Sequence, residues 1–328
     1  MQETLQWLGH WRSFRVMIRK TQWLHFMALI VVAVTSVHSQ QVPYLGYNPP
    51  IENPAYEKGQ GPVVGIDEAH TNFHTATGRY AAFANLVMRD GYRVARVGKA
   101  FSDKQLDVLD ILVIANPIHE DNDRNWRLPT PSAYTDEEIA AVKNWVEQGG
   151  ALFLILDHMP FPGGGGKLAD AFGFKFSNGF AYLGNSLGSA PDVYEPGSGL
   201  MDCVITRGRD DSERITKMVT FTGSAFQPPK EAIQVLVFPQ KSVSKEPKQA
   251  WRFVKGTKEI DISGWCQGAV MKVGEGRIAV FGEAASFTAQ LAGPQKRRMG
   301  MAASHADQNY KLLLNVMHWL SDLEGLPD

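Results

Sequence analysis

Residues 135–158 read TDEEIAAVKNWVEQGGALFLILDH, a helix signal followed directly by a strand signal. Thr135, with a glutamate three residues later, forms a capping box, and apolar residues then recur at helical spacing until a pair of glycines. The uninterrupted apolar run 151–156 is typical of a strand buried on both faces. The stretch therefore predicts a helix followed by a central strand that ends at Asp157 and His158.

The same alternation continues on both sides of this stretch. Strands are expected at 63–66, 92–97 and 111–115, and helices near 80–90 and 103–109. Because parallel neighbours need a crossover of a dozen or more residues, this order predicts an α/β fold with a doubly wound, mostly parallel sheet. Toward the C-terminus, 268–281 predicts an antiparallel hairpin and 312–320 a closing amphipathic helix.

Residues 1–39 are predicted to be a signal peptide. Basic residues precede the apolar run 23–34, and small residues before Gln40 suit cleavage by a signal peptidase. Met17 is a possible true start, because the segment ahead of it is long for a signal peptide. We expect an exported protein, periplasmic or extracellular; the alternative is an uncleaved membrane anchor formed by 23–34.

The remaining chain divides by composition. Residues 40–61, rich in proline, predict an extended linker, and the domain is expected to occupy 62–328. Between 177 and 263 the alternation weakens, which predicts an irregular insertion. Cys203 and Cys266 are the only cysteines; a disulfide and two buried free thiols both remain open.

Charge and incomplete motifs exclude several classes of function. The 33 Lys and Arg balance 34 Asp and Glu, so we expect no nucleic-acid partner, and a membrane contact only through the N-terminal segment. The DEAH at 67–70 imitates an ATPase motif, but the glycine run before Lys167 departs from a P-loop at both ends. These glycines predict a flexible loop beside the site. Cys266 has the spacing of a nucleophile elbow but precedes a strand, which favours a structural role.

Ionisable side chains follow the predicted strands. Because ligands bind open α/β sheets outside the carboxyl ends of the strands, these side chains are expected to converge on one site. The candidate catalytic residues are Asp67, Glu68, His70, Asp157, His158 and Glu283. Carboxylates with imidazoles suit a general acid and base, or a divalent metal with a bound water. The candidate metal ligands are His70, His74, Asp157 and His158. The alternative is that each residue caps a helix or binds backbone.

Four segments carry a family resemblance. IDEAHTNFHTATGRY at 66–80, LDHMPFPGGGGKLADAFGF at 156–174, VGEGRIAVFGEAASFTAQ at 273–290 and ADQNYKLLLNVMHWLS at 306–321 resemble an exported bacterial group within the class I glutamine amidotransferase-like superfamily. The superfamily includes trehalose-utilisation and gliding-motility-type domains. The resemblance implies a flavodoxin-like sheet. It does not imply glutamine hydrolysis by a Cys-His-Glu triad, because no cysteine follows a central strand.

Two functions remain open from the sequence. The first is a hydrolase that acts on a small polar or sugar-like substrate through the strand-end Asp, Glu and His residues; the substrate rests on analogy alone. The second is a non-catalytic binding or scaffold domain at the cell envelope, in which the strand-end residues are structural and the insertion makes the contact.

Overall fold

Five parallel strands form the centre of the main sheet. The computed structural model describes residues 41–183 and 191–323. The strands lie in the order β3 (Arg93–Val97), β2 (Val63–Asp67), β4 (Ile111–Ala115), β5 (Ala151–Ile155) and β16 (Gly276–Phe281). This is the strand order of flavodoxin-like sheets, so the predicted α/β fold is confirmed.

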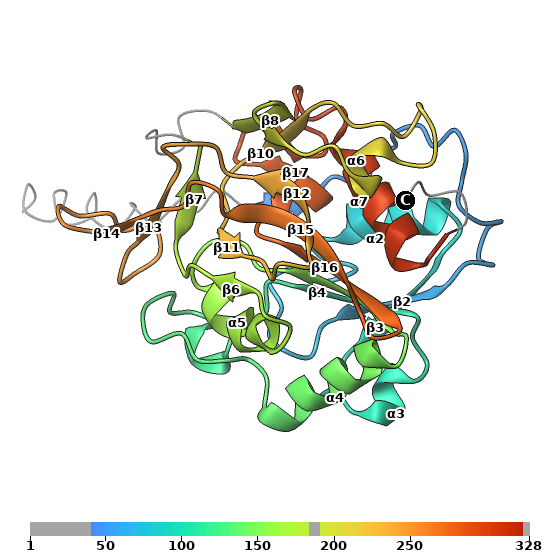
Figure 1. Ribbon diagram of the computed structural model, residues 1–328, viewed down its shortest axis with the longest axis horizontal. Coiled ribbons are helices and arrows are strands. Elements are labelled where there is room, and N and C mark those ends of the chain that lie inside the picture. The colour runs from blue at the N-terminus through green and yellow to red at the C-terminus, as the bar shows by residue number, and fades with distance from the viewer. Residues whose placement is uncertain (1–40, 184–190, 324–328) are drawn as a thin grey trace, which may run out of the picture. The chain divides into compact units, whose positions relative to one another are not determined.

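Helices cover both faces of this sheet (Figure 1). On one face lie α2 (Ala81–Arg89) and α7 (Asn309–Leu320), with the short α6 (Val204–Arg207) against α7. On the other lie α3 (Asp103–Leu106), α4 (Asp136–Glu147) and α5 (Phe161–Ala171). In β5, Phe153 joins the first core and Leu154 the second. β4 and β5 are buried on both faces, which is why their sequences are uninterruptedly apolar.

The predicted helix start at Thr135 is present as a complete capping box with Glu138. After α4, Gly149 takes a φ of 115°, which ends the helix and turns the chain into β5. The local signals of the opening stretch thus match the structure.

The C-terminal hairpin extends the sheet into an antiparallel half. β15 (Cys266–Val273) pairs antiparallel with β16 and leads on to β12 (Ile233–Val237). Four short strands from the predicted insertion extend this half: β9 (Gly199–Leu200), β8 (Asp192–Pro196), β10 (Met218–Thr220) and β11 (Phe226–Gln227). β6 (Lys175–Phe176), just before the insertion, pairs with β11. Much of the insertion is therefore part of the main sheet.

The rest of the insertion forms a separate three-stranded sheet. β7 (Phe180–Tyr182) pairs with β13 (Val243–Glu246), which pairs with β14 (Lys258–Asp261). We call residues 243–261 the arm; Figure 1 shows β13 and β14 extending to the left of the main sheet. The loop at the end of β13 carries Trp251 and packs beside the carboxyl end of β5.

The segment predicted as an extended linker over 40–61 differs from that prediction. β1 (Gln41–Pro43) pairs with β17 (Ala289–Ala292), which continues to β18 (Arg297–Gly300). Tyr47, Ile51 and Tyr56 pack against the core. Residues 41–61 therefore belong to the folded unit, although their apolar residues are too widely spaced to show a period.

The signal prediction for 1–39, with the anchor alternative at 23–34, lies outside the described residues. Within 41–183 and 191–323, no helix has both the length and the apolar character to cross a bilayer.

The glycines at 163–166 are not in a flexible loop. They form the first turns of α5. A Cβ on Gly164 would lie 2.3 Å from the carbonyl oxygen of Pro117, and one on Gly165 would lie 2.2 Å from a methyl of Leu156. The loop prediction is wrong because these glycines allow the helix to pack directly on the strand ends.

The two cysteines are buried free thiols, the second of the two alternatives that the sequence left open. Burial raises the pKa of the Cys266 thiol to about 12. A thiol with this pKa is not a nucleophile at neutral pH, which agrees with the predicted structural role.

Candidate functional site

The predicted site residues lie at the carboxyl ends of the central strands. Asp67 is the last residue of β2, Asn116 follows β4, Asp157 follows β5 by two positions and Glu283 follows β16 by two. The structure divides the candidate residues into two groups with different surroundings.

The first group is centred on His70. Its Nδ1 lies 2.9 Å from Asp67 and its Nε2 lies 2.8 Å from Oε1 of Glu138. The Tyr134 hydroxyl also donates to Asp67, at 3.1 Å. Burial lowers the pKa of His70, but its hydrogen bonds to the two carboxylates raise it above the ordinary value overall. Because both ring nitrogens are paired, this histidine links β2 to α4 and is not placed to bind a ligand.

Glu68 is paired in a similar way. Its carboxylate accepts from the backbone N–H of Ala76 at 2.8 Å and from Arg96 at 2.6 Å. It fixes the loop after β2 against β3. Of the predicted catalytic set, Asp67, Glu68 and His70 are thus all hydrogen-bonded to other groups of the fold.

The second group is organised by Asn116. This residue has a φ of 54°, a conformation uncommon outside glycine but tolerated by asparagine. Its Oδ1 accepts from the backbone N–H of Asp157 at 2.8 Å, and its Nδ2 lies 3.2 Å from Nδ1 of His74. Since the amide nitrogen donates, His74 Nδ1 accepts, which assigns the His74 proton to Nε2.

His158 has the opposite tautomer. Its Nδ1 lies 2.7 Å from the carbonyl oxygen of Met159, so it donates there and Nε2 carries the lone pair. Within 41–183 and 191–323, the hydrogen bonds of these two rings involve Nδ1 and not Nε2. Burial, followed by Arg79 and His158, lowers the pKa of His74 well below 6.5. The two imidazoles thus offer one donor and one acceptor.

Asp157 and Glu283 are the two carboxyl groups near these histidines, and both accept hydrogen bonds from the backbone. Asp157 accepts from the backbone N–H groups of His158 at 2.6 Å and Ala284 at 3.1 Å. Glu283 caps the 3₁₀ turn η2 (Ala285–Phe287) by accepting from Ala285 and Ser286. Burial raises the pKa of both carboxyls, and the charge of Asp157 raises that of Glu283 further. Their oxygens are directed to the backbone.

Aromatic rings surround His158. Phe180 stacks on its imidazole at 4.6 Å between ring centroids, and Trp251 of the arm lies 4.6 Å away on edge. Phe161 and Trp126 lie 5.5 and 6.1 Å away. These rings come from β7, the arm, α5 and the loop after β4, so four distant parts of the chain meet over one histidine.

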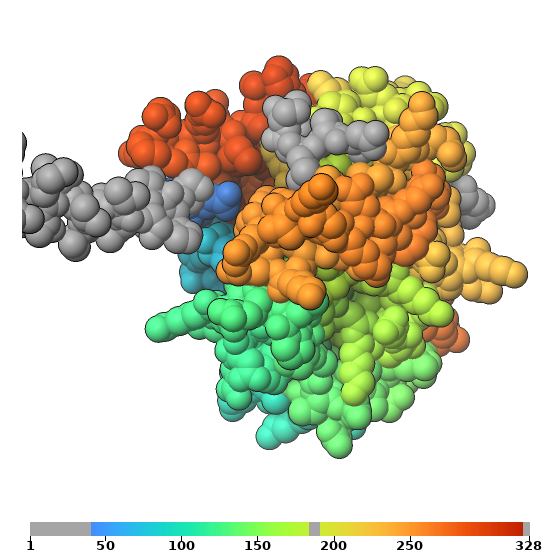
Figure 2. Space-filling view, turned by 90° about the vertical axis from the view of Figure 1, so that its left-hand side faces the viewer, coloured from blue at the N-terminus to red at the C-terminus, as the bar shows by residue number. Residues whose placement is uncertain are grey.

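The loop after β4 and the arm are joined by backbone hydrogen bonds close to His158. We call the joined residues, 125–130 and 248–251, the roof. The N–H of Ala250 donates to the carbonyl of Trp126 at 2.8 Å, and the N–H of Leu128 donates to that of Lys248 at 3.0 Å. Figure 2 shows the orange arm lying against the green segment that contains the loop after β4. Beneath the roof, His158 keeps 9% of its surface exposed.

The predicted metal set does not come together. His70 belongs to the first group, whereas His74, Asp157 and His158 belong to the second. Among the residues that the structure describes, no three His, Cys, Asp or Glu side chains are arranged to hold a metal ion. The residues present therefore do not fit the divalent metal considered from the sequence.

Sequence reasoning missed several residues of the site. Glu138 was recognised only as a helix cap, and Arg79, Trp126, Phe180 and Trp251 were not singled out. No local pattern marks them, because each lies on a loop, helix or strand that only the tertiary fold brings to the strand ends.

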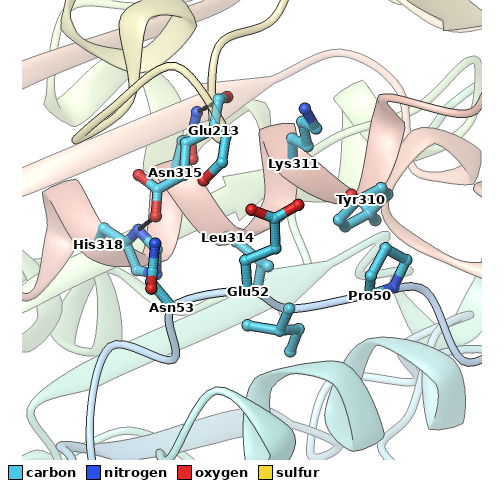
Figure 3. A pocket seen from close by; sticks show the side chains of 11 residues that line it. Pro50, Glu52, Asn53, Glu213, Tyr310, Lys311, Leu314, Asn315 and His318 are labelled. Carbon is cyan, nitrogen blue, oxygen red and sulfur yellow. Dashed lines mark hydrogen bonds and ion pairs between the residues drawn. The ribbon is translucent and has the colours of Figure 1, made fainter.

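A separate small cavity lies away from the strand ends, between 50–53 and α7 (Figure 3). It has a volume of about 50 Å³. Beside it, His318 Nε2 lies 2.7 Å from Asp90 and its Nδ1 lies 3.6 Å from Glu213. Both acids are paired with His318, and none of the candidate strand-end residues lines the cavity.

No protein-family model matches the sequence, and no significant relative is found among curated proteins. Among solved structures, the mmIFT52 N-terminal domain is similar over 79% of this chain and 97% of that domain, with 15% identity and a TM-score of 0.55. This similarity concerns the fold alone.

Two further structures are more distant. A ThuA-like protein from Bacteroides uniformis has 13% identity over 84% of this chain and 95% of its own, with a TM-score of 0.42. A GMP synthase component from Thermoplasma acidophilum has 10% identity over 79% and 94%, with a TM-score of 0.38. At these scores neither similarity supports an inference about fold family or activity.

Proposed function

We propose that the domain binds a small hydroxyl-bearing, sugar-like molecule at His74 and His158 and hydrolyses it with His158 as the general base. The observation that carries this proposal is the pair of opposite tautomers. A ligand with several hydroxyl groups can donate to His158 Nε2 and accept from His74 Nε2–H, so it suits both imidazoles.

The same arrangement suits a nucleophilic water. His158 takes a proton from the water as the water oxygen bonds to the electrophilic carbon of the substrate. The bond between that carbon and the leaving oxygen then breaks, and His158 returns the proton to the leaving oxygen. Asp157 lies beside His158, and an ionised carboxylate there stabilises the imidazolium that forms.

The aromatic rings supply the apolar part of the site. A pyranose has a face of C–H groups, and such a face packs on the electron-rich faces of aromatic rings. Pockets that combine aromatic walls with a few convergent polar groups are typical of small-ligand sites. Because His158 is largely covered, entry requires the two segments of the roof to separate, which breaks two backbone hydrogen bonds.

A non-catalytic binding domain is the second candidate. It is favoured by the carboxyl groups, since Asp67, Asp157 and Glu283 all accept hydrogen bonds from within the fold. In this case the same pair of histidines binds the ligand without turnover.

Titration of monosaccharides and aryl glycosides, followed by NMR signals of the histidine rings, tests the proposal. We expect shifts at His74 and His158, and loss of binding in His74→Gln and His158→Gln. The control His305→Gln changes an exposed histidine and should bind normally. Turnover that disappears in His158→Gln supports the hydrolase, and binding without turnover supports the second candidate. Unchanged histidine signals throughout the panel would contradict both.

A further inference from the structure

Arg79 is a positively charged side chain beside the candidate site. It lies in the loop between β2 and α2, five residues after His74. The carbon at the centre of its guanidinium lies 3.7 Å from the ring centroid of Phe73. Phe73 in turn contacts His74, Trp126 and Phe161, at 5.5, 5.3 and 5.5 Å between ring centroids. Phe73 thus contacts both this guanidinium and the rings near His158. We call Phe73, Trp126 and Phe161 the aromatic wall.

The hydrogen bonds of Arg79 are incomplete. Its Nη1 donates to the carbonyl of Phe73 at 3.5 Å, a long contact. Its Nε is buried and has no partner among the described residues. The planar edge formed by Nε and Nη2 is therefore unused within 41–183 and 191–323.

Arg79 also has no carboxylate partner in the part of the chain that the structure describes. By contrast, the partly buried Arg209 binds Glu213, and the buried carboxylate of Glu68 binds Arg96. Removing a cation from water without a counter-charge is unfavourable, and burial lowers the pKa of Arg79 accordingly. Its uncompensated charge also lowers the pKa of neighbouring His74.

We infer that Arg79 binds an anionic group, a carboxylate or a phosphate, on the molecule held by His74 and His158. The location of the rest of that molecule rests on the proposed function. A guanidinium edge matches two oxygens of such an anion through parallel hydrogen bonds, and the stack on Phe73 fixes its plane. The ligand class narrows accordingly from neutral sugars to sugar acids or sugar phosphates.

The test compares glucose, glucuronate and glucose 6-phosphate on the full chain by calorimetry. We expect both anions to bind roughly tenfold or more tightly than glucose, as a charge-assisted bidentate contact predicts. Arg79→Met should remove this difference, so that both anions bind no more tightly than glucose. Arg79→Lys keeps the charge but not the planar edge and should restore only part of it. The stronger of the two anions identifies the source of the negative charge.

Arg124→Met is the matched control. Arg124 is 95% exposed in the loop after β4, so it contributes to the same field without contacting the aromatic wall. If Arg79→Met and Arg124→Met lose equal affinity for the two anions, the anions are attracted only by the long-range field of the protein. This result would overturn the inference.

A direct readout separates this inference from the proposed function. The NMR signal of Arg79 Nε–H should shift on addition of glucuronate or of inorganic phosphate alone. An unmoved signal with all anions overturns the inference, even if sugars bind at the histidines. A shift at Arg79 with unmoved His74 and His158 supports the anion site while removing the proposed function.

Discussion

His70 shows how one side chain decides between a catalytic and a structural account. It lies between two carboxylates with its ring buried, so truncation leaves Asp67 and Glu138 without their shared partner. Breaking a buried ion pair on one side costs about 3 kcal/mol or more. We expect His70→Ala to lose about that much in urea unfolding, and the exposed His305→Ala to lose almost nothing. Normal stability with lost activity would instead restore His70 to the catalytic set.

His318 predicts a pH dependence of stability. Burial lowers its pKa, but Asp90 and Glu213 raise it above 6.5 overall. A raised pKa means that the folded state holds the proton more tightly than the unfolded state. The stabilisation is therefore complete below about pH 6.5 and is lost as the pH rises through the folded pKa.

Unfolding free energies measured from about pH 6 to about pH 9 check this sign. The difference between the wild type and His318→Asn isolates His318 from His70, whose pKa is also raised. We expect that difference to shrink with increasing pH. A difference that grows over the same range would show that His318 is buried as the neutral form.

At the scale of elements, α5 offers a matched pair of substitutions. A Cβ on Gly166 meets no atom within 4 Å, whereas one on Gly164 meets the carbonyl of Pro117 at 2.3 Å. Alanine is better than glycine in a helix by about 0.5 to 1 kcal/mol. Gly166→Ala should therefore raise the thermal midpoint and Gly164→Ala should lower it. Equal effects of the two substitutions would show that α5 does not pack as closely as its geometry indicates.

The sequence predicts the elements that local interactions stabilise better than the elements that depend on tertiary packing. The capping box at Thr135 and the apolar run before Asp157 are local signals, and both appear as expected. In α5, by contrast, tertiary packing overrides the low helix propensity of four consecutive glycines. The same holds for β1, whose pairing with β17 leaves no periodic trace.

The candidate site divides in the same way. The strand-end rule placed Asp67, Asp157 and Glu283 at one edge of the sheet, as found. It could not assign their partners, because Tyr134 and the backbone of η2 reach those carboxyls only in the folded chain. Separating paired from unpaired groups required the structure.

For the whole molecule, the predicted cleavage site of the signal peptide lies next to the first residue of the folded unit. Cleavage before Gln40 would leave β1 intact, since its pairing begins at Gln41 opposite Ala292. We expect N-terminal sequencing of the chain from fractionated cells to find Gln40 first in the extracytoplasmic fraction. A chain that keeps residues 1–39 and sediments with membranes would favour the anchor formed by 23–34.

The parallel pairing of β16 with β5 has a consequence for biosynthesis. Arg277 lies opposite Ala151, so everything between these positions is made before the central sheet gains its fifth parallel strand. β5 leaves the ribosome well before β16. Until β16 is made, the edge of β5 that will pair with it keeps its N–H and C=O groups unpaired. Such long-range pairing is slow. The nascent chain therefore passes through an interval in which β5, an entirely apolar strand, is open to association with other chains. Chaperones that shield strand edges would act in that interval.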